Sequence, residues 1–400
     1  MLMRFGGSLL CRGAMRHPQI PAKQRLSQLL FLQPKTRTCS TVQNVQSAKS
    51  RSVGLWLAGC SGMVAGAVLL GGITRLTESG LSMVNWSLIK EMKPPSNQQE
   101  WEEEFSRYQQ SPEFQALHSH FTLEDFKRIF YMEWAHRMWG RAIGLAYFIP
   151  LAYFVARGKI AKTDYKRHGA FCCLLLAQGG YGWYMVKSGL KKPERDTDMP
   201  RVSQYRLAGH LFLAFLLYSG FLWTSMSHLK RDLLFESHKN LKRLRILAHI
   251  SKAMVFITAM SGAFVAGLDA GLIYNSFPKM GDFWVPPEIL DFDPKWKNFF
   301  ENSTTVQFDH RILGMSTLTI ISSTWIMSRF TPLPKRAKLA ASCLMAMALF
   351  QVHLGITTLK NYVPISTASM HQCGSLVALS LALWLSHELK GIKRVARKIK

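Results

Sequence analysis

The feature that most constrains this sequence is a set of long apolar runs. Each run approaches the roughly 20 residues that a bilayer requires. Eight such runs can be marked, at residues 53–73, 132–155, 168–186, 207–227, 246–268, 308–327, 339–359 and 363–385. Lipid offers no partners to backbone groups, so each run is expected to be a helix. The sequence therefore predicts an all-α integral membrane protein with eight transmembrane helices.

The formal net charge of +26 is distributed by side of the membrane. One set of segments between and after the runs holds 21 Lys/Arg against 4 acids, at 156–167, 228–245, 328–338 and 386–400. The opposite set holds 16 Lys/Arg against 18 acids, at 74–131, 187–206, 269–307 and 360–362. Basic loops mark the inner side of a membrane protein. The basic excess is therefore topological, and no nucleic-acid role is inferred from it.

The first 52 residues have the composition of a mitochondrial presequence. They carry nine Lys/Arg and no acid, and the first acidic residue of the chain is Glu78. Acid-free, Arg- and Ser-containing leaders are typical of mitochondrial import, although a basic disordered tail would share this composition. We expect the inner mitochondrial membrane, with both termini in the matrix. The seven cysteines form no CxxC pair and are interpreted as small buried thiols.

The second half of the chain repeats the first. "LTESGL" (76–81) follows the first run and "GLDAGL" (267–272) the fifth, and "QGGYGWYMVK" and "QVHLGITTLK" share Gln, Gly and Lys at identical offsets. Matches in a common order indicate duplication. Each half has an even number of runs, so the copies are parallel. The predicted parts are a leader (1–52), two four-helix bundles (53–227 and 246–388), a matrix linker (228–245) and a basic tail (389–400).

Four histidines occupy equivalent positions near the outer ends of the even-numbered runs: His136, His210, His310 and His371. Ionisable residues in membrane spans are costly and usually functional. Two histidines per bundle are the number needed to ligate a haem iron from both faces. The predicted pairs are His136 with His210, and His310 with His371. A single such histidine could equally be a hydrogen-bonded interface residue. His353 has no counterpart in the first half and His249 lies near the basic side, and both are interpreted as packed or snorkelling residues.

One carboxylate distinguishes the two halves. Glu133 lies three residues before His136, on the same helical face, whereas its counterpart before His310 is Gln307. A carboxylate can transfer protons and an amide cannot, so Glu133 is the candidate catalytic acid/base. The alternative is a structural pair with a nearby arginine. Arg137 and Arg311 follow the histidines and could pair with haem propionates, or with lipid headgroups.

These residues resemble the haem A synthase family in its mitochondrial form, associated with cytochrome oxidase assembly. The similarity covers about residues 53–388. Its motifs are "GGITRLTESGLSMVNW", "EWAHRMWGR", "GLDAGLIYNSFPKMG", "QFDHRILG" and "ASMHQCGS". Some bacterial members have a cysteine pair in the first outer loop, and residues 74–131 have no cysteine. A mechanism that depends on those thiols is therefore in doubt for this chain.

The resemblance implies an oxidoreductase that converts haem O to haem A, oxidising a methyl to a formyl group by successive hydroxylations. It implies that Glu133 is the essential carboxylate, that His136 and His210 hold the substrate haem, and that His310 and His371 hold a haem b cofactor. A matrix ferredoxin with its reductase is the implied electron source, since the sequence has no flavin, iron–sulfur or dinucleotide motif. Other implied partners are membrane lipid, the haem O synthase and oxidase assembly factors.

Two other functions use the same histidines. A dihaem b-type electron-transfer cytochrome would need no Glu133, and a transporter or haem exporter would bind haem only transiently. The parallel repeat and the preserved spacing of the histidines argue against a transporter or an exporter. Oligomeric state is left open, a homo-oligomer included.

Overall fold

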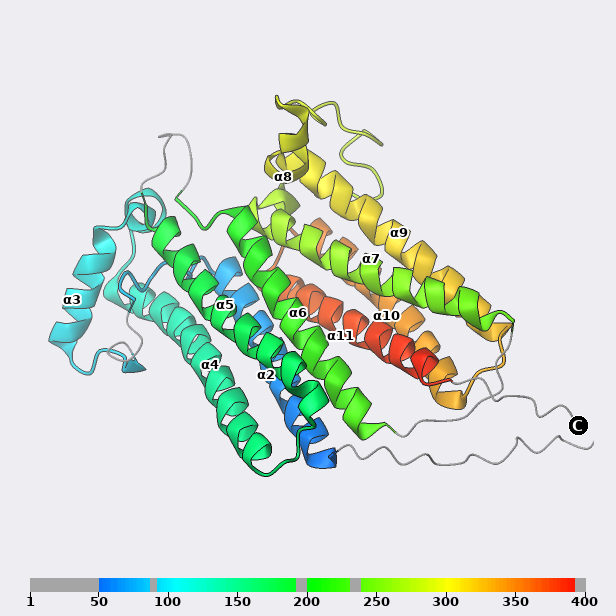
Figure 1. Cartoon of the computed structure of the whole chain (residues 1–400). Coiled ribbons are helices and arrows are strands. Elements are labelled where there is room, and N and C mark those ends of the chain that lie inside the picture. The colour runs from blue at the N-terminus through cyan, green and yellow to red at the C-terminus, as the bar shows by residue number, and fades with distance from the viewer. Residues whose placement is uncertain (1–49, 87–91, 192–199, 231–238, 393–400) are drawn as a thin grey trace, which may run out of the picture. The chain divides into compact units, whose positions relative to one another are not determined.

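The computed structural model describes residues 50–86, 92–191, 200–230 and 239–392, which are mostly helical and contain no β-strand (Figure 1). The long helices are α2 (Arg51–Leu76), α4 (Leu123–Ala156), α5 (Tyr165–Gly189), α6 (Gln204–Leu229), α7 (Leu241–Gly267), α9 (Ser303–Arg329), α10 (Lys335–Lys360) and α11 (Ile365–Lys390). Shorter elements are α3 (Gln98–Gln109), a π-helical turn (Phe114–His118), α8 (Asn298–Glu301) and the 3₁₀ turns Lys162–Asp164, η4 (Ala270–Leu272) and Lys295–Lys297.

Each predicted apolar run coincides with one long helix. Among the described residues, six helices are long and apolar enough to cross a membrane: α2, α4, α6, α7, α10 and α11. The chain is thus a multi-pass membrane protein. The two remaining long helices, α5 and α9, carry more polar side chains, among them Gln178 and the pair His310–Arg311. Eight crossings therefore stay a prediction.

Several predicted segments fall outside the described residues. They are residues 1–49 of the leader, 231–238 of the linker and 393–400 of the tail. Helix α2 begins at Arg51, at the end of the predicted leader, and α11 continues to Lys390.

Helix α4 begins at Leu123, well before the predicted apolar run. Thr122 and Asp125 form a capping box, in which each side chain bonds the other's backbone N–H. The resulting 34 residues rise about 51 Å, more than the ~30 Å of a hydrocarbon core. The first turns of α4 therefore extend beyond the predicted apolar run. There Phe126 and Phe130 pack against Trp101 of α3 in a separate small apolar cluster.

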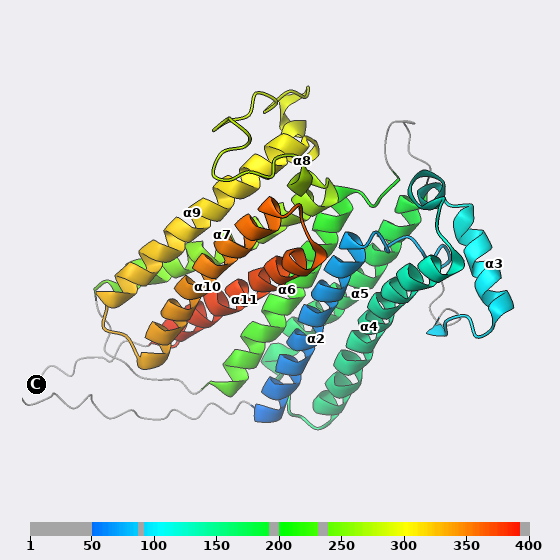
Figure 2. The same ribbon diagram turned by 180° about the vertical axis from the view of Figure 1, so that it is seen from behind.

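The long helices pack in the same pairs in each half. Helix α2 packs against α4 and α6, and α5 against the same two helices. In the second half, α7 packs against α9 and α11, as does α10. The halves meet where α6 contacts α7 and where α11 contacts α2 and α6, and the apolar core runs through this contact (Figures 1 and 2).

Equivalent turns follow the first helix of each half. Glu78 and Asp269 occupy matching positions and both have left-handed backbone angles, with φ of 51° and 50°. Asp269 receives hydrogen bonds from Arg75 and Arg201 of the first half, each at 2.8 Å. One carboxylate thereby joins the two halves at their outer ends.

Candidate functional site

The four candidate histidines project from α4, α6, α9 and α11, and each ring lies against a glycine of a neighbouring helix. A Cβ added at Gly71 or Gly355 would stand 2.9 Å from Cε1 of His136 or His371, respectively. The corresponding distances are 3.2 Å from Gly182 to His210 and 3.3 Å from Gly262 to His310. The repeat thus contains four glycine–histidine contacts. The glycines leave room for the rings at the helix crossings.

The rings of His310 and His371 lie in an edge-type contact, with centroids 6.3 Å apart and planes at 82° to each other. A metal bonded to an imidazole nitrogen at about 2.0 Å on each side would give a centroid separation of roughly 6 Å. The centroid separation of this pair would therefore suit one metal ion bonded by a nitrogen of each imidazole. Within the described residues, no comparable ring contact joins His136 to His210, and the His210 ring stacks on Tyr181 instead. In the part of the chain that is described, no group of three or more His, Cys, Asp or Glu is arranged to hold a metal ion.

Hydrogen bonding prepares His310 to act as a ligand through Nε2. Its Nδ1 lies 2.7 Å from the Ser261 hydroxyl, which itself donates to the Thr258 carbonyl at 2.8 Å. Because the hydroxyl proton is used there, Ser261 accepts from Nδ1–H, and the lone pair is left on Nε2. Sequence analysis did not single out Ser261. The small pair Ser261–Gly262 in the middle of an apolar helix was the available signal.

The other three histidines have buried Nδ1 atoms without a partner among the described residues. Glutamines at equivalent positions hold the backbone of two of them. Gln351 Nε2 donates to the His371 carbonyl at 2.7 Å, and Gln178 Nε2 to the His210 carbonyl at 3.2 Å. Gln178 also lies 3.2 Å from Nε2 of His210. The two halves therefore differ here: Gln178 contacts both the ring and the carbonyl of His210, whereas Gln351 bonds the carbonyl of His371.

Glu133 is buried in a complete shell of donors. Its Oε2 accepts from the Ser82 hydroxyl at 2.7 Å and from the Met83 N–H at 2.8 Å, and its Oε1 accepts from Arg137 at 2.6 Å. Only 3% of the residue is exposed. The segment after α2 is thereby fastened to α4 one helical turn before His136. The sequence suggested an ion pair between Glu133 and an arginine, but it gave no indication of Ser82 or Met83.

Gln307 occupies the matching place in the second half, but it donates hydrogen bonds to the adjoining loop where Glu133 accepts them. Its Nε2 donates to the carbonyls of Ala270 and Tyr274, at 2.7 and 3.2 Å, and its Oε1 accepts from Arg311 at 3.0 Å. The loop after α7 therefore presents acceptors where the loop after α2 presents donors. A carboxylate suits the first environment, and an amide suits the second.

Both arginines bind these loops from the helix side. Arg137 donates to the carbonyls of Met83 and Asn85 and stacks on Trp86 at 4.6 Å. Arg311 donates to the carbonyls of Tyr274 and Lys279. These contacts assign each guanidinium a structural role, and binding of haem propionates stays a prediction.

The remaining histidine candidates lie apart from these pairs. His353 of α10 is exposed, and His249 of α7 is also exposed, with its Nδ1 3.2 Å from Lys252 Nζ. Within the described segments, neither histidine makes a ring contact or a hydrogen bond with one of the four candidate ligands.

The glycine contacts give a first expected result. Gly355→Ala places a methyl 2.9 Å from the His371 ring, so the ring must shift and haem retention should fall severalfold. Gly180→Ala, in the matching helix α5, meets nothing within 4 Å and should leave haem retention unchanged. Haem per protein after gel filtration measures both. Equal retention by the two variants would contradict the role assigned to Gly355.

A second buried polar cluster lies in the outer segment before α4. The Tyr108 hydroxyl contacts Glu113 at 3.1 Å and Nδ1 of His118 at 2.6 Å, and Nε2 of His118 lies 3.7 Å from Glu78. Burial raises the pKa of the Glu113 carboxyl from 4.5 to about 8, partly offset by the Tyr108 hydrogen bond and increased by the nearby carboxylates of Glu133 and Glu78. The hydrogen bond to His118 lowers the pKa of Glu78.

The raised pKa predicts a pH-dependent stability of this segment. The folded state binds the Glu113 proton more tightly than the unfolded state, so its stabilising effect is full below pH 4.5 and is lost as the pH rises towards 8. The melting temperature should therefore be several degrees lower at pH 8 than at pH 5.5. Glu113→Gln should flatten this difference. An unchanged pH profile in the variant would assign the dependence to other groups.

Comparison with known proteins adds independent findings. A family model described as cytochrome oxidase assembly protein, COX15-CtaA, matches residues 54–383. The chain is 53% identical over 384 residues to heme A synthase COX15 of Bos taurus, covering 96% of this chain and 92% of that one. It is 41% identical over 360 residues to heme A synthase of Nitrosospira multiformis, covering 90% and 99%. It is 39% identical over 378 residues to a heme A synthase–mitochondrial ferredoxin fusion protein of Schizosaccharomyces pombe, covering 87% and 61%.

Proposed function

The chain belongs to the haem A synthase family of cytochrome oxidase assembly proteins, and from this premise we propose that it oxidises a methyl group of haem O to the formyl group of haem A. The oxidation would run through two hydroxylations of one carbon, each removing two electrons and inserting one oxygen atom from an external oxidant, followed by loss of water from the hydrated aldehyde. The product serves cytochrome c oxidase. The resemblance noted in the sequence is confirmed by the matched family and by the identity to its members.

The observation that carries the proposal is the single carboxylate beside one histidine pair. Glu133 lies on the same face of α4 as His136, and the equivalent position in α9 is an amide. We assign reaction to the first half, with haem O between His136 and His210. Glu133 is then the residue that exchanges protons with the reacting group, at carboxylate oxygens held in place by Ser82, Met83 and Arg137.

The second pair would hold a haem b cofactor. The close approach of the His310 and His371 rings, and the hydrogen bond from His310 to Ser261, support this assignment. Iron chemistry on the bound haem supplies the oxidation or relays electrons to it. The chain's contribution is to orient the ligands, to exclude water between packed helices and to move protons at Glu133.

We further propose eight membrane crossings arranged as two parallel four-helix bundles, in the inner mitochondrial membrane, with the basic ends in the matrix. The matching helix pairs in the two halves support the duplication. A ferredoxin with its reductase is the proposed electron source, and the fusion relative of Schizosaccharomyces pombe supports it. The basic loops would attract such an acidic carrier. Residues 1–52 would be the import sequence.

Incubation of the purified full-length protein in aerated buffer with haem O, ferredoxin, its reductase and a reduced nicotinamide cofactor tests the function. Extracted haems, separated by mass, should contain haem b, hydroxylated haem O and haem A. If haem O stays unconverted while haem b cycles between redox states, the protein is an electron-transfer cytochrome instead.

A further inference from the structure

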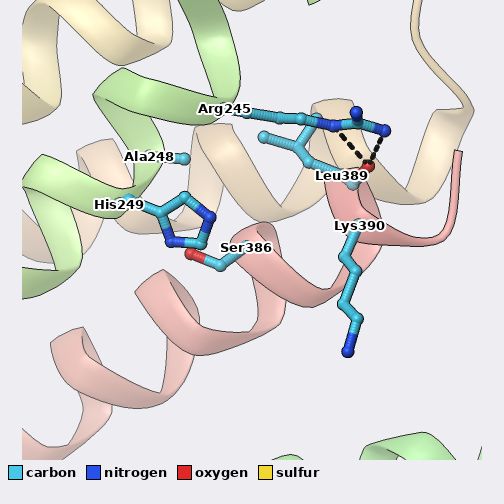
Figure 3. Close-up of a pocket in the computed structure, with 6 residues that line it drawn as sticks. All are labelled: Arg245, Ala248, His249, Ser386, Leu389 and Lys390. Atoms are coloured by element: carbon cyan, nitrogen blue, oxygen red, sulfur yellow. Dashed lines mark hydrogen bonds between the residues drawn. The ribbon is translucent and has the colours of Figure 1, made fainter. Parts of the chain in front are cut away.

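At the basic ends of the helices, α7 and α11 enclose a pocket of about 160 Å³ that takes no part in the site described above (Figure 3). The side chains that line it are Arg245, Ala248, His249, Ser386, Leu389 and Lys390. At this end of the helices, two ammonium groups lie over the ring of Trp223 from α6. Lys252 Nζ is 5.5 Å and Lys390 Nζ 5.3 Å from its ring centre.

The cations around the pocket are not neutralised by the described residues. Arg245 donates to the backbone carbonyls of Leu389 and Ile392, which fixes its guanidinium at the edge of the pocket. The buried carboxylate at this end, Glu388, pairs with Lys230 and Arg336. Within the described ranges, no ion pair to a carboxylate joins Arg245, Lys252 or Lys390. The pocket therefore has an uncompensated positive potential.

Ser386 adds a buried donor that lacks an acceptor. Only 2% of the residue is exposed, it lines the pocket, and its hydroxyl has no hydrogen-bond partner among the described residues. Figure 3 shows this hydroxyl pointing towards the His249 ring, across the space between α7 and α11. A buried unsatisfied hydroxyl costs about 1–3 kcal/mol, so an occupant with an acceptor oxygen would be stabilised here.

The face of α7 beside the pocket is apolar and exposed. Ile246, Ile250 and Ile257 are between 41% and 50% exposed, and the first two directly follow Arg245 and His249 in sequence. In a membrane protein such a face is in contact with acyl chains. The pocket thus lies at the end of a lipid-facing stripe, on the side where basic residues predominate.

We propose that this pocket binds the phosphate of an anionic phospholipid, with Arg245, Lys252, Lys390 and the Ser386 hydroxyl around the headgroup and the acyl chains along α7. Basic pockets between membrane helices on the inner side suit such headgroups. The adjoining isoleucines favour a lipid over a free anion, because only a lipid would also cover them. This site is independent of the proposed haem chemistry.

Native mass spectrometry of the full chain in detergent tests the site, with phosphatidylglycerol or phosphatidylcholine added. The wild type should retain one phosphatidylglycerol per chain and release phosphatidylcholine. Lys252→Gln with Lys390→Gln should weaken retention about thirtyfold, since each cation near an anionic headgroup contributes roughly a factor of five. The matched double variant Lys162→Gln with Lys166→Gln removes the same charge from exposed positions on the same side and should retain the lipid.

Two further measurements keep the proposal open to failure. Lys390→Arg preserves the charge and should restore retention when it replaces Lys390→Gln. In the wild type, millimolar inorganic phosphate should not displace the lipid. Displacement by phosphate would indicate a free-anion pocket, and equal retention of both lipids or by both double variants would indicate an unspecific annulus. Each of those outcomes overturns the proposal.

Discussion

Glu133→Gln should stop conversion of haem O while the four histidines keep their positions. A side chain that transfers protons in the transition state contributes about 10²–10⁴-fold to the rate, and an amide cannot replace it. The variant also loses an acceptor among three donors, at a cost of about 1–3 kcal/mol in stability. Haem species per protein and the melting temperature, measured on the same preparation, separate the two effects.

Glu388→Gln is the matched control for this experiment. Its carboxylate is 2% exposed, pairs with Lys230 at 2.8 Å and lies at the opposite end of the helices. The control should be destabilised at least as much as Glu133→Gln and still produce haem A. Product formation by Glu133→Gln at a near wild-type rate would leave the carboxylate with a structural role only.

His371→Ala should remove the haem b of the second half, to less than about a tenth of the wild-type content, because one axial bond is lost. The truncated side chain leaves a space beside Gly355 that imidazole can enter. Added imidazole should therefore restore part of the haem content. Haem per protein, by extraction and mass, gives the result.

His353→Ala serves as the comparison, since this histidine belongs to α10 and is exposed. It should retain haem fully with or without imidazole. If His371→Ala and His353→Ala hold equal haem, the predicted ligand pair is wrong.

Much of the fold could be predicted because a bilayer allows few choices. Apolar length alone located the eight long helices, and periodic matches between the halves agree with their packing. Helix ends were predicted less well, since Thr122 and Asp125 extend α4 through a capping box that lies outside the apolar run. Neither the charge distribution nor the hydropathy of the sequence shows where α4 begins.

The candidate site, too, could be predicted only in part. The four histidines could be selected as candidates from their spacing, because they occupy matching positions in the two halves of the sequence. Ser82 and Met83 could not, since their roles depend on where loops and helices meet in space. Ser261 could be noticed only as a small residue beside Gly262 in an apolar helix. Gly71 and Gly262 precede the matching turns by the same number of residues, yet only the crossing of helices shows that they face rings.

The opposite polarity of the two loops has a consequence for how the halves could have diverged. An exchange of Glu133 for the amide, or of Gln307 for the acid, sets like groups against each other: donors against donors, or acceptors against acceptors. Neither exchange is neutral unless the adjoining loop also reorients. Each half therefore tolerates only its own residue. The difference between Glu133 and Gln307 is fixed by the direction of a few N–H and C=O groups in the adjoining loops.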